Sequence, residues 1–173
     1  MKVEIINKDH KDLDKIHQLY EESFPNDEKA PFSLLIEKLT TKKGLLLAYY
    51  IDNEFIGFTY LIKDKGIVYI FYFSIVKKYR NKGYGTKILS LLKDKYHDCF
   101  IFLEIEKVID ELTQKRKDFY IRNGFKDSMY RYFFYVDYEV LYYGENFDIH
   151  QCHDLFYEFT DGFLDVDFKR SSL

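Results

Sequence analysis

The 173-residue chain lacks tryptophan and contains only two cysteines and two prolines. Cys99 and Cys152 are too few for the disulfide framework that small secreted domains use. With two prolines, no low-complexity stretch and no internal repeat, the sequence shows no obvious linker between domains. We therefore expect a single domain over residues 1–173, which is long enough to bury a substantial hydrophobic core.

The chain also has no large net charge and no long apolar run. Its formal net charge of −3 and its pI near 6.0 argue against nucleic-acid binding, because such binding usually needs a basic face. No apolar stretch approaches the roughly 18 to 20 residues that span a membrane. The charged N-terminus is unlike a signal peptide. We expect a cytoplasmic protein that binds neither nucleic acid nor membrane.

Aromatic side chains, in contrast, are abundant, since 17 Tyr and 17 Phe make up 20% of the residues. A surface that stacks nucleic-acid bases needs basic residues beside its aromatic rings, along a groove. Most of the rings in this chain lie inside apolar, strand-like segments instead. We therefore interpret them as core residues.

The spacing of apolar residues predicts the order of the secondary-structure elements. Helical spacing indicates helices over residues 12–24, 32–39 and 86–96, a further helix that ends at Asn123-Gly124, and an added helix over 148–160. Apolar, β-rich runs indicate strands over residues 3–6, 45–51, 55–62, 67–75, 101–106, 131–136 and 139–143. The short turns between the second, third and fourth strands permit only antiparallel neighbours. The strand-helix-strand unit that follows implies a parallel crossover.

These elements predict an α+β (mixed α/β) fold with a central, mostly antiparallel twisted sheet, one parallel βαβ crossover and flanking helices. We expect the core to end near residue 143 and residues 144–173 to form an extension packed on it. The segment 137–168 contains nine acidic residues and no Lys or Arg. It forms either a solvated outer face or an acidic wall that attracts a cationic substrate.

The most informative segment is Tyr79 to Thr86, which reads Tyr-Arg-Asn-Lys-Gly-Tyr-Gly-Thr between an apolar strand and a helix. Glycines let the backbone approach a ligand. The N–H groups of a first helical turn have no partner inside the helix and can bind an anion. Arg80 and Lys82 add positive charge, and an arginine can bind two oxygens at once. The segment therefore predicts a phosphate-binding loop.

Two other phosphate-binding motifs fit this segment less well. A dinucleotide-binding fingerprint needs a third glycine where the chain has Ile88. The antiparallel strands before the loop also argue against that fold. A Walker A loop needs Gly-Lys-Ser/Thr, which does not follow here.

Residues 74–85 resemble the acetyl-CoA signature of the GNAT superfamily of N-acetyltransferases, Arg/Gln-x-x-Gly-x-Gly/Ala after the fourth strand. Residues 119–125, Phe-Tyr-Ile-Arg-Asn-Gly-Phe, are similar to the Tyr-x-x-x-Gly-Phe with which a helix of this family ends. The order of elements matches as well, over roughly residues 1–143. The resemblance implies a GNAT fold and an enzyme that passes acetyl from acetyl-CoA directly to an amine of a small molecule or peptide.

The resemblance also implies roles for individual residues. Ile75 and its neighbours Phe73 and Ser74 would offer backbone groups to the pantetheine arm. The loop would wrap the pyrophosphate through Arg80, Asn81, Lys82, Gly83, Tyr84, Gly85 and Thr86. Tyr120 would lie near the thioester sulfur of the cofactor and act as the acid. Thr113 and Arg116 stand where the family often has Asn and Ala, and Thr113 would hydrogen-bond the cofactor.

Acetyl transfer gains from a general base, because an amine with a pKa of about 10.4 is mostly protonated at pH 7. Many family members keep their base on the strand 67–75, which has no carboxylate here. Glu104 and Glu106 share a face of the next strand, about 6.6 Å apart, and their like charges should raise one pKa. We predict Glu104 as the base and Glu106 as a substrate contact. Alternatively, both carboxylates face solvent or pair with Lys107.

Glu28 lies between the first two predicted helices, in a segment that borders the acceptor site in GNAT proteins. It is a second predicted contact for a substrate ammonium group, or else an exposed loop residue. His150 and His153 can share a helix face, but no second ligand pair accompanies them, so we expect no metal. 

Two other functions stay open, namely a non-catalytic acyl-CoA-binding module and an enzyme that uses another acyl or aminoacyl donor. Exposed aromatic strands near the C-terminus would suit a homodimer.

Overall fold

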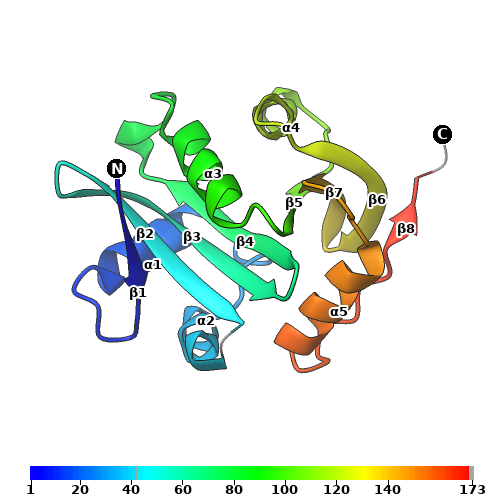
Figure 1. Ribbon diagram of the computed structural model, residues 1–173, viewed down its shortest axis with the longest axis horizontal. Coiled ribbons are helices and arrows are strands. Elements are labelled where there is room, and N and C mark those ends of the chain that lie inside the picture. Colours follow the sequence, from blue (N-terminus) through cyan, green and yellow to red (C-terminus); the bar gives the residue numbers. More distant parts are fainter. Residues whose placement is uncertain (42, 172–173) are drawn as a thin grey trace. The chain divides into compact units, whose positions relative to one another are not determined.

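A computed structural model describes residues 1–41 and 43–171 of the chain. Its residues gather into two compact units (Figure 1). Unit 1 contains Met1–Lys63 and Ile70–Leu89, and unit 2 contains Asp64–Tyr69 and Ser90–Leu173. Two strands and one helix contribute residues to both units. The single domain expected from the sequence stays a prediction.

Unit 1 combines antiparallel strands with two helices at its N-terminal end. Its elements are β1 (Lys2–Ile6), α1 (Leu13–Ser23), α2 (Phe32–Lys38), the 3-10 turn η1 (Leu39–Thr41), β2 (Gly44–Ile51), β3 (Glu54–Asp64), most of β4 (Ile67–Ile75), the 3-10 turn η2 (Lys77–Tyr79) and the start of α3 (Tyr84–Lys95). β2 pairs with both β1 and β3 in antiparallel fashion. α1 buries Ile16, Leu19 and Tyr20, spaced as one face of an amphipathic helix.

The β2–β3 connection is a two-residue turn made by Asp52 and Asn53. Both residues have positive φ angles, 49° and 64°, which a type I′ hairpin turn requires and which Asp and Asn tolerate. β2 and β3 are buried along most of their length. Their residues are accordingly apolar in long runs instead of alternating with polar ones.

Unit 2 is built around the second half of the sheet. Its elements are the start of β4, the end of α3, β5 (Phe100–Glu106), α4 (Glu111–Arg122), β6 (Lys126–Phe134), β7 (Val136–Tyr143), α5 (Ile149–Phe159) and β8 (Lys169–Arg170). β4 and β5 are parallel, with Ile67–Tyr69 opposite Phe100–Phe102. The other pairs of this unit, β5 with β7 and β6 with both β7 and β8, are antiparallel.

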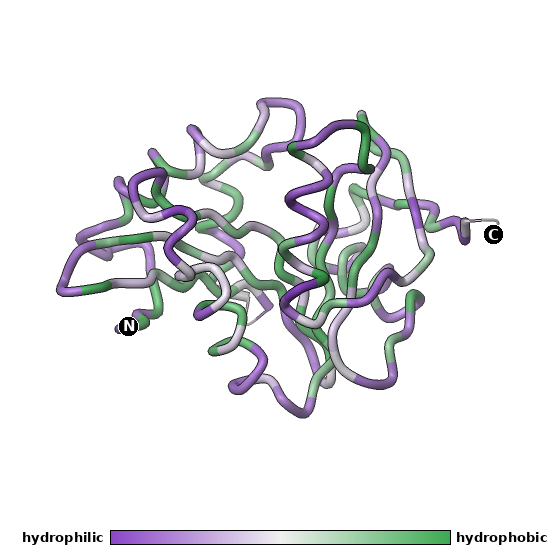
Figure 2. The backbone as a smooth tube through the Cα atoms, turned by 90° about the horizontal axis from the view of Figure 1, so that it is seen from above, coloured by the Kyte–Doolittle hydropathy of each residue, from purple (hydrophilic) through white to green (hydrophobic). Residues whose placement is uncertain are grey.

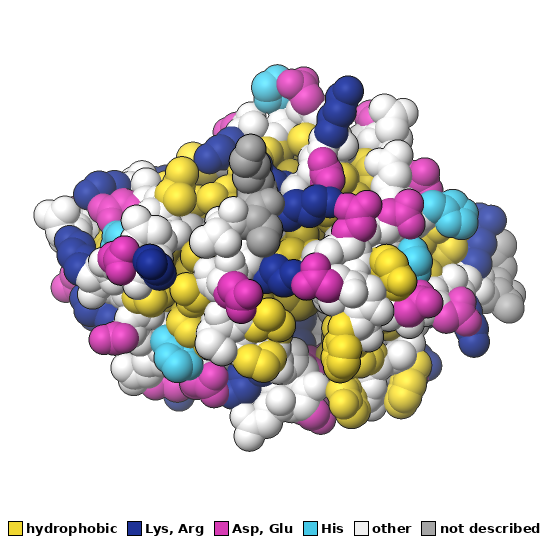
Figure 3. All heavy atoms as spheres, turned by 90° about the horizontal axis from the view of Figure 1, so that it is seen from below, with side chains coloured by type: hydrophobic (Ala, Val, Ile, Leu, Met, Phe, Trp, Pro, Cys, Tyr) yellow, Lys and Arg dark blue, Asp and Glu magenta, His cyan; other side chains and the backbone are white. Residues whose placement is uncertain are grey.

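Across the described residues the strands form a mixed sheet of order β1-β2-β3-β4-β5-β7-β6-β8. This sheet, with its one parallel pair and five α-helices, confirms the predicted fold class. β2, β3 and β4 consist mostly of apolar residues. Along the backbone, hydrophobic stretches alternate with hydrophilic ones, and several of the protruding loops are hydrophilic (Figure 2). Acidic and basic side chains are interspersed on the face shown in Figure 3, consistent with the small net charge.

The bounds predicted from the sequence for the last hairpin, 131–136 and 139–143, are wrong. β6 begins at Lys126, five residues before the predicted strand 131–136, and the turn falls at Tyr135. A register shift between Asp127 and Arg131 interrupts the pairing, so the alternation that would reveal the strand is broken. Tyr135 turns the chain with a φ of 63°, a conformation that tyrosine seldom adopts. The short strand β8 was also missed.

Residues 144–171 pack within unit 2. α5 buries Cys152, Leu155, Phe156 and Phe159 along one face, and the Phe156 ring meets the Tyr69 ring of β4 at a centroid distance of 6.0 Å. β8 adds a strand to the edge of β6. The C-terminal segment therefore places side chains beside the start of β4.

Candidate active site

The predicted phosphate-binding loop joins β4 to α3 in unit 1. Asn81 and Gly83 have left-handed backbones, with φ angles of 59° and 80°. A Cβ at Gly83 would meet no atom within 4 Å, so the positive φ and not crowding favours glycine there. α3 begins at Tyr84, and the Lys87 N–H makes an early helical bond to the Gly83 carbonyl at 3.1 Å. The N–H groups of residues 84–86 thus lie at the open end of a helix, where anions bind.

Exposed positive charge surrounds this helix start. Arg80 and Lys82 are both exposed. Arg80 Nε donates to the carbonyl of Ile75 at 2.8 Å, while its terminal nitrogens have no partner among the residues that the structure describes. Lys78, in contrast, already pairs with Glu54 at 3.0 Å. Arg80 and Lys82 are therefore the loop cations best placed to bind a phosphate.

The end of β4, where the pantetheine contacts were predicted, is closely packed on one side. Ser74 is buried, and its Oγ lies 2.6 Å from Oγ of Ser23 on α1. A Cβ on Gly57 would approach the Ser74 carbonyl to 2.4 Å, so only glycine lets β3 lie this close to β4. Phe73 and Ile75, on either side of Ser74, are partly exposed.

Glu28 lies in the segment between α1 and α2, and it is partly buried instead of fully exposed. Its N–H donates to the Pro25 carbonyl at 3.1 Å. The Tyr72 hydroxyl of β4 donates to the Glu28 carbonyl at 3.2 Å and accepts from the Ala30 N–H at 3.0 Å. This segment is therefore held against β4 by its backbone, and the role of the Glu28 carboxylate stays a prediction.

In unit 2, Glu104 lies on β5, two residues beyond the last described residue pair with β4. Its Oε2 accepts hydrogen bonds from the Tyr132 hydroxyl at 2.6 Å and from the Tyr69 hydroxyl. Oε1 has no hydrogen-bond partner within residues 1–41 and 43–171. Burial raises the pKa of Glu104 to about 7, and the hydrogen bonds from Tyr132 and Tyr69 act against this rise.

Glu106 has a different environment from the one expected. Its Oε2 accepts from Arg116 Nη1 at 2.8 Å, whereas Lys107 lies 3.7 Å from Asp137. The alternative that the glutamates pair with Lys107 is therefore wrong. The pKa of Glu104 is raised as predicted, but the cause is burial and not the like charge of Glu106.

Tyr120 lies in the last turn of α4, with its ring 5.1 Å from that of Phe119 and 5.7 Å from that of Phe125. In the described part of the chain its hydroxyl has no hydrogen-bond partner. Burial raises the pKa of Tyr120 to about 12, while the charge of Arg116 lowers it. A phenol that keeps its proton at neutral pH has the protonation state that a general acid needs.

The motif over residues 119–125 is a helix end of a known kind. Gly124 has a φ of 84°, and its N–H donates to the Ile121 carbonyl at 2.9 Å. The Phe125 N–H donates to the Tyr120 carbonyl at 3.1 Å, and its ring is buried. Together these two bonds form a Schellman motif. Gly124 and Phe125 thus fix the end of the helix that carries Tyr120.

Thr113 has a local role that the sequence reading missed. Its hydroxyl donates to Oδ1 of Asp110 at 2.7 Å and accepts from the N–H groups of Ile109 and Asp110, both at 3.1 Å. The Thr113 N–H also donates to Asp110 Oδ1. These bonds form a capping box at the start of α4. Since the hydroxyl is already engaged, a contact between Thr113 and a cofactor stays a prediction without direct support.

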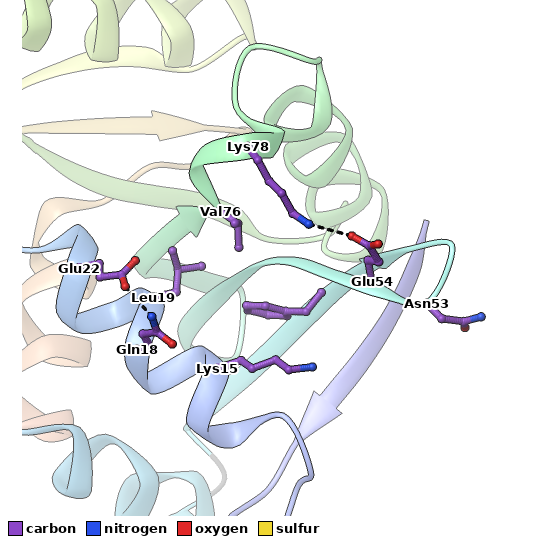
Figure 4. Close-up of a pocket in the computed structure, with 9 residues that line it drawn as sticks. Lys15, Gln18, Leu19, Glu22, Asn53, Glu54, Val76 and Lys78 are labelled. Atoms are coloured by element: carbon purple, nitrogen blue, oxygen red, sulfur yellow. Dashed lines mark hydrogen bonds and ion pairs between the residues drawn. The ribbon is translucent and has the colours of Figure 1, made fainter.

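One pocket lies within unit 1, between α1, the β2–β3 turn and the end of β4 (Figure 4). Its volume is about 430 Å³. Leu19, Phe55 and Val76 give it an apolar lining, and its polar lining consists of Lys15, Gln18, Glu22, Asn53, Glu54 and Lys78. Two polar pairs of the lining bond to each other, Lys78 with Glu54 and Gln18 with Glu22. The pocket contains none of the predicted site residues.

The described residues contain no group of three or more His, Cys, Asp or Glu side chains placed to hold a metal ion. His153 instead bonds to Asp165 through Nε2 at 2.9 Å, and this bond raises the pKa of His153. Nor does the described part of the chain include a helix that is both long and apolar enough to span a bilayer.

Within unit 1, the open helix start after the loop is suited to bind a phosphorylated ligand. Within unit 2, the partly buried Glu104 carboxylate has the raised pKa that suits a general base. A model of the acetyltransferase (GNAT) family matches residues 13–125, which is more than half of the 173 residues. The chain therefore belongs to the GNAT family of acetyltransferases. It is accordingly an acetyltransferase, and the acyl donor of this family is acetyl-CoA.

Solved structures share the fold at low sequence identity. A Bacteroides thetaiotaomicron protein described as a GNAT-family acetyltransferase is 24% identical, with a TM-score of 0.75, and the match covers 89% of this chain and 92% of that one. A chimera based on the spermidine N-acetyltransferase of Vibrio cholerae is 16% identical, with a TM-score of 0.66 and coverage of 83% and 96%. A Bacillus subtilis acetyltransferase in complex with CoA is 15% identical, with a TM-score of 0.62 and coverage of 84% and 99%. No curated protein matches the chain.

Proposed function

We propose that the protein transfers the acetyl group of acetyl-CoA directly to a primary amine of a small molecule or peptide, with Glu104 as general base and Tyr120 as general acid. The observation that carries this proposal is the Glu104 carboxylate. Its pKa is raised to about 7 by burial, and its Oε1 has no partner among the described residues. A base with a pKa near the working pH is the most effective one.

The proposed reaction moves two protons from the acceptor nitrogen. Glu104 takes one proton from the ammonium group, which frees the lone pair to attack the thioester carbon. The carbon–nitrogen bond forms, the carbon–sulfur bond breaks, and the leaving sulfur takes a proton from Tyr120. The second nitrogen proton restores Tyr120, and Glu104 releases its proton to water. The products are the acetylated amine, CoA and one proton.

The residues of the loop fit the donor. Arg80 and Lys82 present exposed positive charge, and the left-handed backbones of Asn81 and Gly83 lead into the open start of α3. Such a helix start binds pyrophosphate oxygens through backbone N–H groups. The likeness to an acetyltransferase solved with CoA supports the same donor for this chain. Acetyl-CoA would supply the activated acetyl thioester.

The acceptor is proposed to be cationic before it reacts. The segment 137–168 carries nine acidic residues and no Lys or Arg, and charge of one sign attracts ligands of the other. The likeness to a spermidine N-acetyltransferase supports the same class of acceptor. Glu106 is less suited to bind an ammonium group than predicted, because Arg116 already neutralises it. The cytoplasmic location and the homodimer stay predictions from the sequence.

The test combines acetyl-CoA binding with thiol release. Calorimetry with acetyl-CoA should detect binding that Arg80→Glu weakens about 10- to 100-fold, since a charge-assisted hydrogen bond contributes about 1.5 to 3 kcal/mol. Lys65→Glu makes the same substitution to glutamate at an exposed turn before β4, and it should leave binding unchanged. Thiol release should then follow in the presence of at least one primary amine, with an acetylated product detected by mass spectrometry. Binding without release from any polyamine, amino acid, aminoglycoside or peptide would favour a non-catalytic acyl-CoA sensor.

A further inference from the structure

Three elements of unit 2 place side chains around the Glu104 carboxylate. Tyr69 of β4 and Tyr132 of β6 donate hydrogen bonds to the carboxylate, and Cys152 of α5 lies near enough for its thiol to feel the charge of Glu104. All three are buried, with relative exposures of 2%, 8% and 0%. The two tyrosine hydroxyls donate to the same oxygen, Oε2.

Aromatic packing holds both tyrosine rings in place. The Tyr69 ring stacks on Phe102 at 4.3 Å and meets Phe156 edge-on at 6.0 Å. The Tyr132 ring stacks on Tyr138 at 5.1 Å and meets a further ring, that of Phe168, at 5.2 Å. Rings packed on two sides have little freedom to turn, so the two hydroxyls are fixed relative to Glu104.

We propose that Tyr69 and Tyr132 are positioning residues that hold Oε2 of Glu104 and leave Oε1 as the oxygen that takes the proton from the acceptor amine. This inference rests on the proposed function, because it assumes that Glu104 is the base. Tyr132 lies outside residues 13–125, which the family model matches. The C-terminal part of the chain therefore supplies one of the two residues that orient the base.

The pair has an electrostatic role besides orientation. Each hydroxyl stabilises the ionised carboxylate, and so it opposes the burial that favours the neutral acid. Burial and the two tyrosine hydrogen bonds set the pKa of Glu104, and no charged side chain of the described residues is among its causes. Burial raises the pKa of the Cys152 thiol, which therefore stays neutral. Val140 is the residue opposite Glu104 on β7, and Glu106 on its own strand is paired with Arg116 of α4.

The consequence is a defined pH response. Without either hydroxyl, Glu104 should hold its proton to higher pH. The ascending limb of the pH profile of kcat/KM should then move to higher pH, and kcat/KM at pH 6.5 should fall about tenfold for each pH unit of displacement. A purely structural role for the tyrosines would lower activity at every pH without moving the limb.

The experiment uses the full chain with Tyr132→Phe and Tyr69→Phe as separate variants. Tyr96→Phe is the matched control, because Tyr96 carries a buried hydroxyl in unit 2 that has no hydrogen-bond partner in the described part of the chain. Each variant is measured for its pH profile of kcat/KM and for the titration of Glu104 by 13C NMR of labelled glutamate carboxyls. Glu104→Gln assigns the resonance and measures the dependence of activity on the carboxylate.

We expect the kcat/KM profile and the Glu104 titration both to move to higher pH in Tyr132→Phe, in Tyr69→Phe or in both. In Tyr96→Phe neither of them should move. A Glu104 titration that moves in neither Tyr132→Phe nor Tyr69→Phe overturns the proposal. A titration that moves without the kcat/KM profile overturns it too, because the held carboxylate is then not the group that limits the reaction. Full activity of Glu104→Gln is a separate result, which removes Glu104 as base and with it the proposed mechanism.

Discussion

The loop in unit 1 and the Glu104 cluster in unit 2 are built in opposite ways. In the loop, the groups that can bind an anion face solvent: Arg80 and Lys82 are exposed, and the helix α3 starts beside them. In the cluster, Tyr69 and Tyr132 are buried and both of their hydroxyls donate to Oε2 of Glu104. Oε1 of Glu104 therefore has no hydrogen-bond partner among the described residues. The difference follows from the chemistry. An anion can be bound at the surface by backbone N–H groups and fixed positive charge, but a carboxylate becomes a base effective near pH 7 only when burial raises its pKa.

Removal of the base with the loop left intact should have the largest effect. Glu104→Gln should lower kcat about 10²- to 10⁴-fold, the usual contribution of a general base. Its affinity for acetyl-CoA should stay unchanged, because the loop residues are untouched. Thiol-release assays measure kcat, and calorimetry measures the affinity for acetyl-CoA. Glu111→Gln, at an exposed position on α4, is the control and should behave as the wild type.

The same substitution should reveal a stability cost of the buried carboxylate. The pKa of Glu104 is raised from 4.5 to about 7 in the folded state, so its favourable contribution is fully present below pH 4.5 and is lost as the pH rises to 7. Between pH 5 and pH 8, the free energy of unfolding of Glu104→Gln should therefore improve relative to the wild type by on the order of 3 kcal/mol.

Urea denaturation at the two pH values measures this difference, again with Glu111→Gln as the control. A difference that does not depend on pH would mean that the Glu104 carboxyl titrates as it does in the unfolded chain.

On the side of the loop, a pair of glycines separates backbone strain from function. Gly83 and Gly66 have similar φ angles, 80° and 77°, and neither would bring a Cβ within 4 Å of another atom. Gly83→Ala and Gly66→Ala should each lower stability by about 1 kcal/mol, because alanine is strained at a positive φ. Only Gly83→Ala should also weaken acetyl-CoA binding, by up to about tenfold, the equivalent of 1.4 kcal/mol. Equal affinities in the two variants would argue that the loop backbone does not contact the donor.

The smallest expected effect concerns a buried hydroxyl that the site does not use. Tyr96 carries a buried hydroxyl with no hydrogen-bond partner in the described residues, which costs stability. Tyr96→Phe should therefore raise the free energy of unfolding by about 1 kcal/mol and leave kcat unchanged. Thermal melts and steady-state kinetics measure both. A loss of stability would show that the hydroxyl is bonded in solution, for example through water.

The sequence was most informative where a backbone conformation strongly favours one residue type, as a positive φ favours glycine. Gly83 of the loop and Gly124 at the end of α4 mark backbone conformations that other residues avoid. The motifs around them could therefore be recognised without a structure. Long apolar runs likewise located most strands, because β2 and β3 are buried along most of their length.

Features that depend on distant pairing could not be read in this way. Tyr69 and Tyr132 stand 35 and 28 residues from Glu104, in strands where tyrosine resembles an ordinary core residue. Arg116 gave no sign that it would neutralise Glu106, because α4 and β5 meet only in the fold. The turn at Tyr135 lacks the Gly, Asn or Asp that normally announces one.

If burial makes Glu104 a base near neutral pH, the titration of its carboxyl group will show it. The measurement is the 13C carboxyl titration of Glu104 in the wild-type protein, compared with the pH profile of kcat/KM for an acetylated amine. We expect Glu104 to titrate near pH 7 and the ascending limb of the profile to fall at the same pH. A titration near the ordinary value of 4.5, or a limb that follows only the pKa of the free amine, would contradict it.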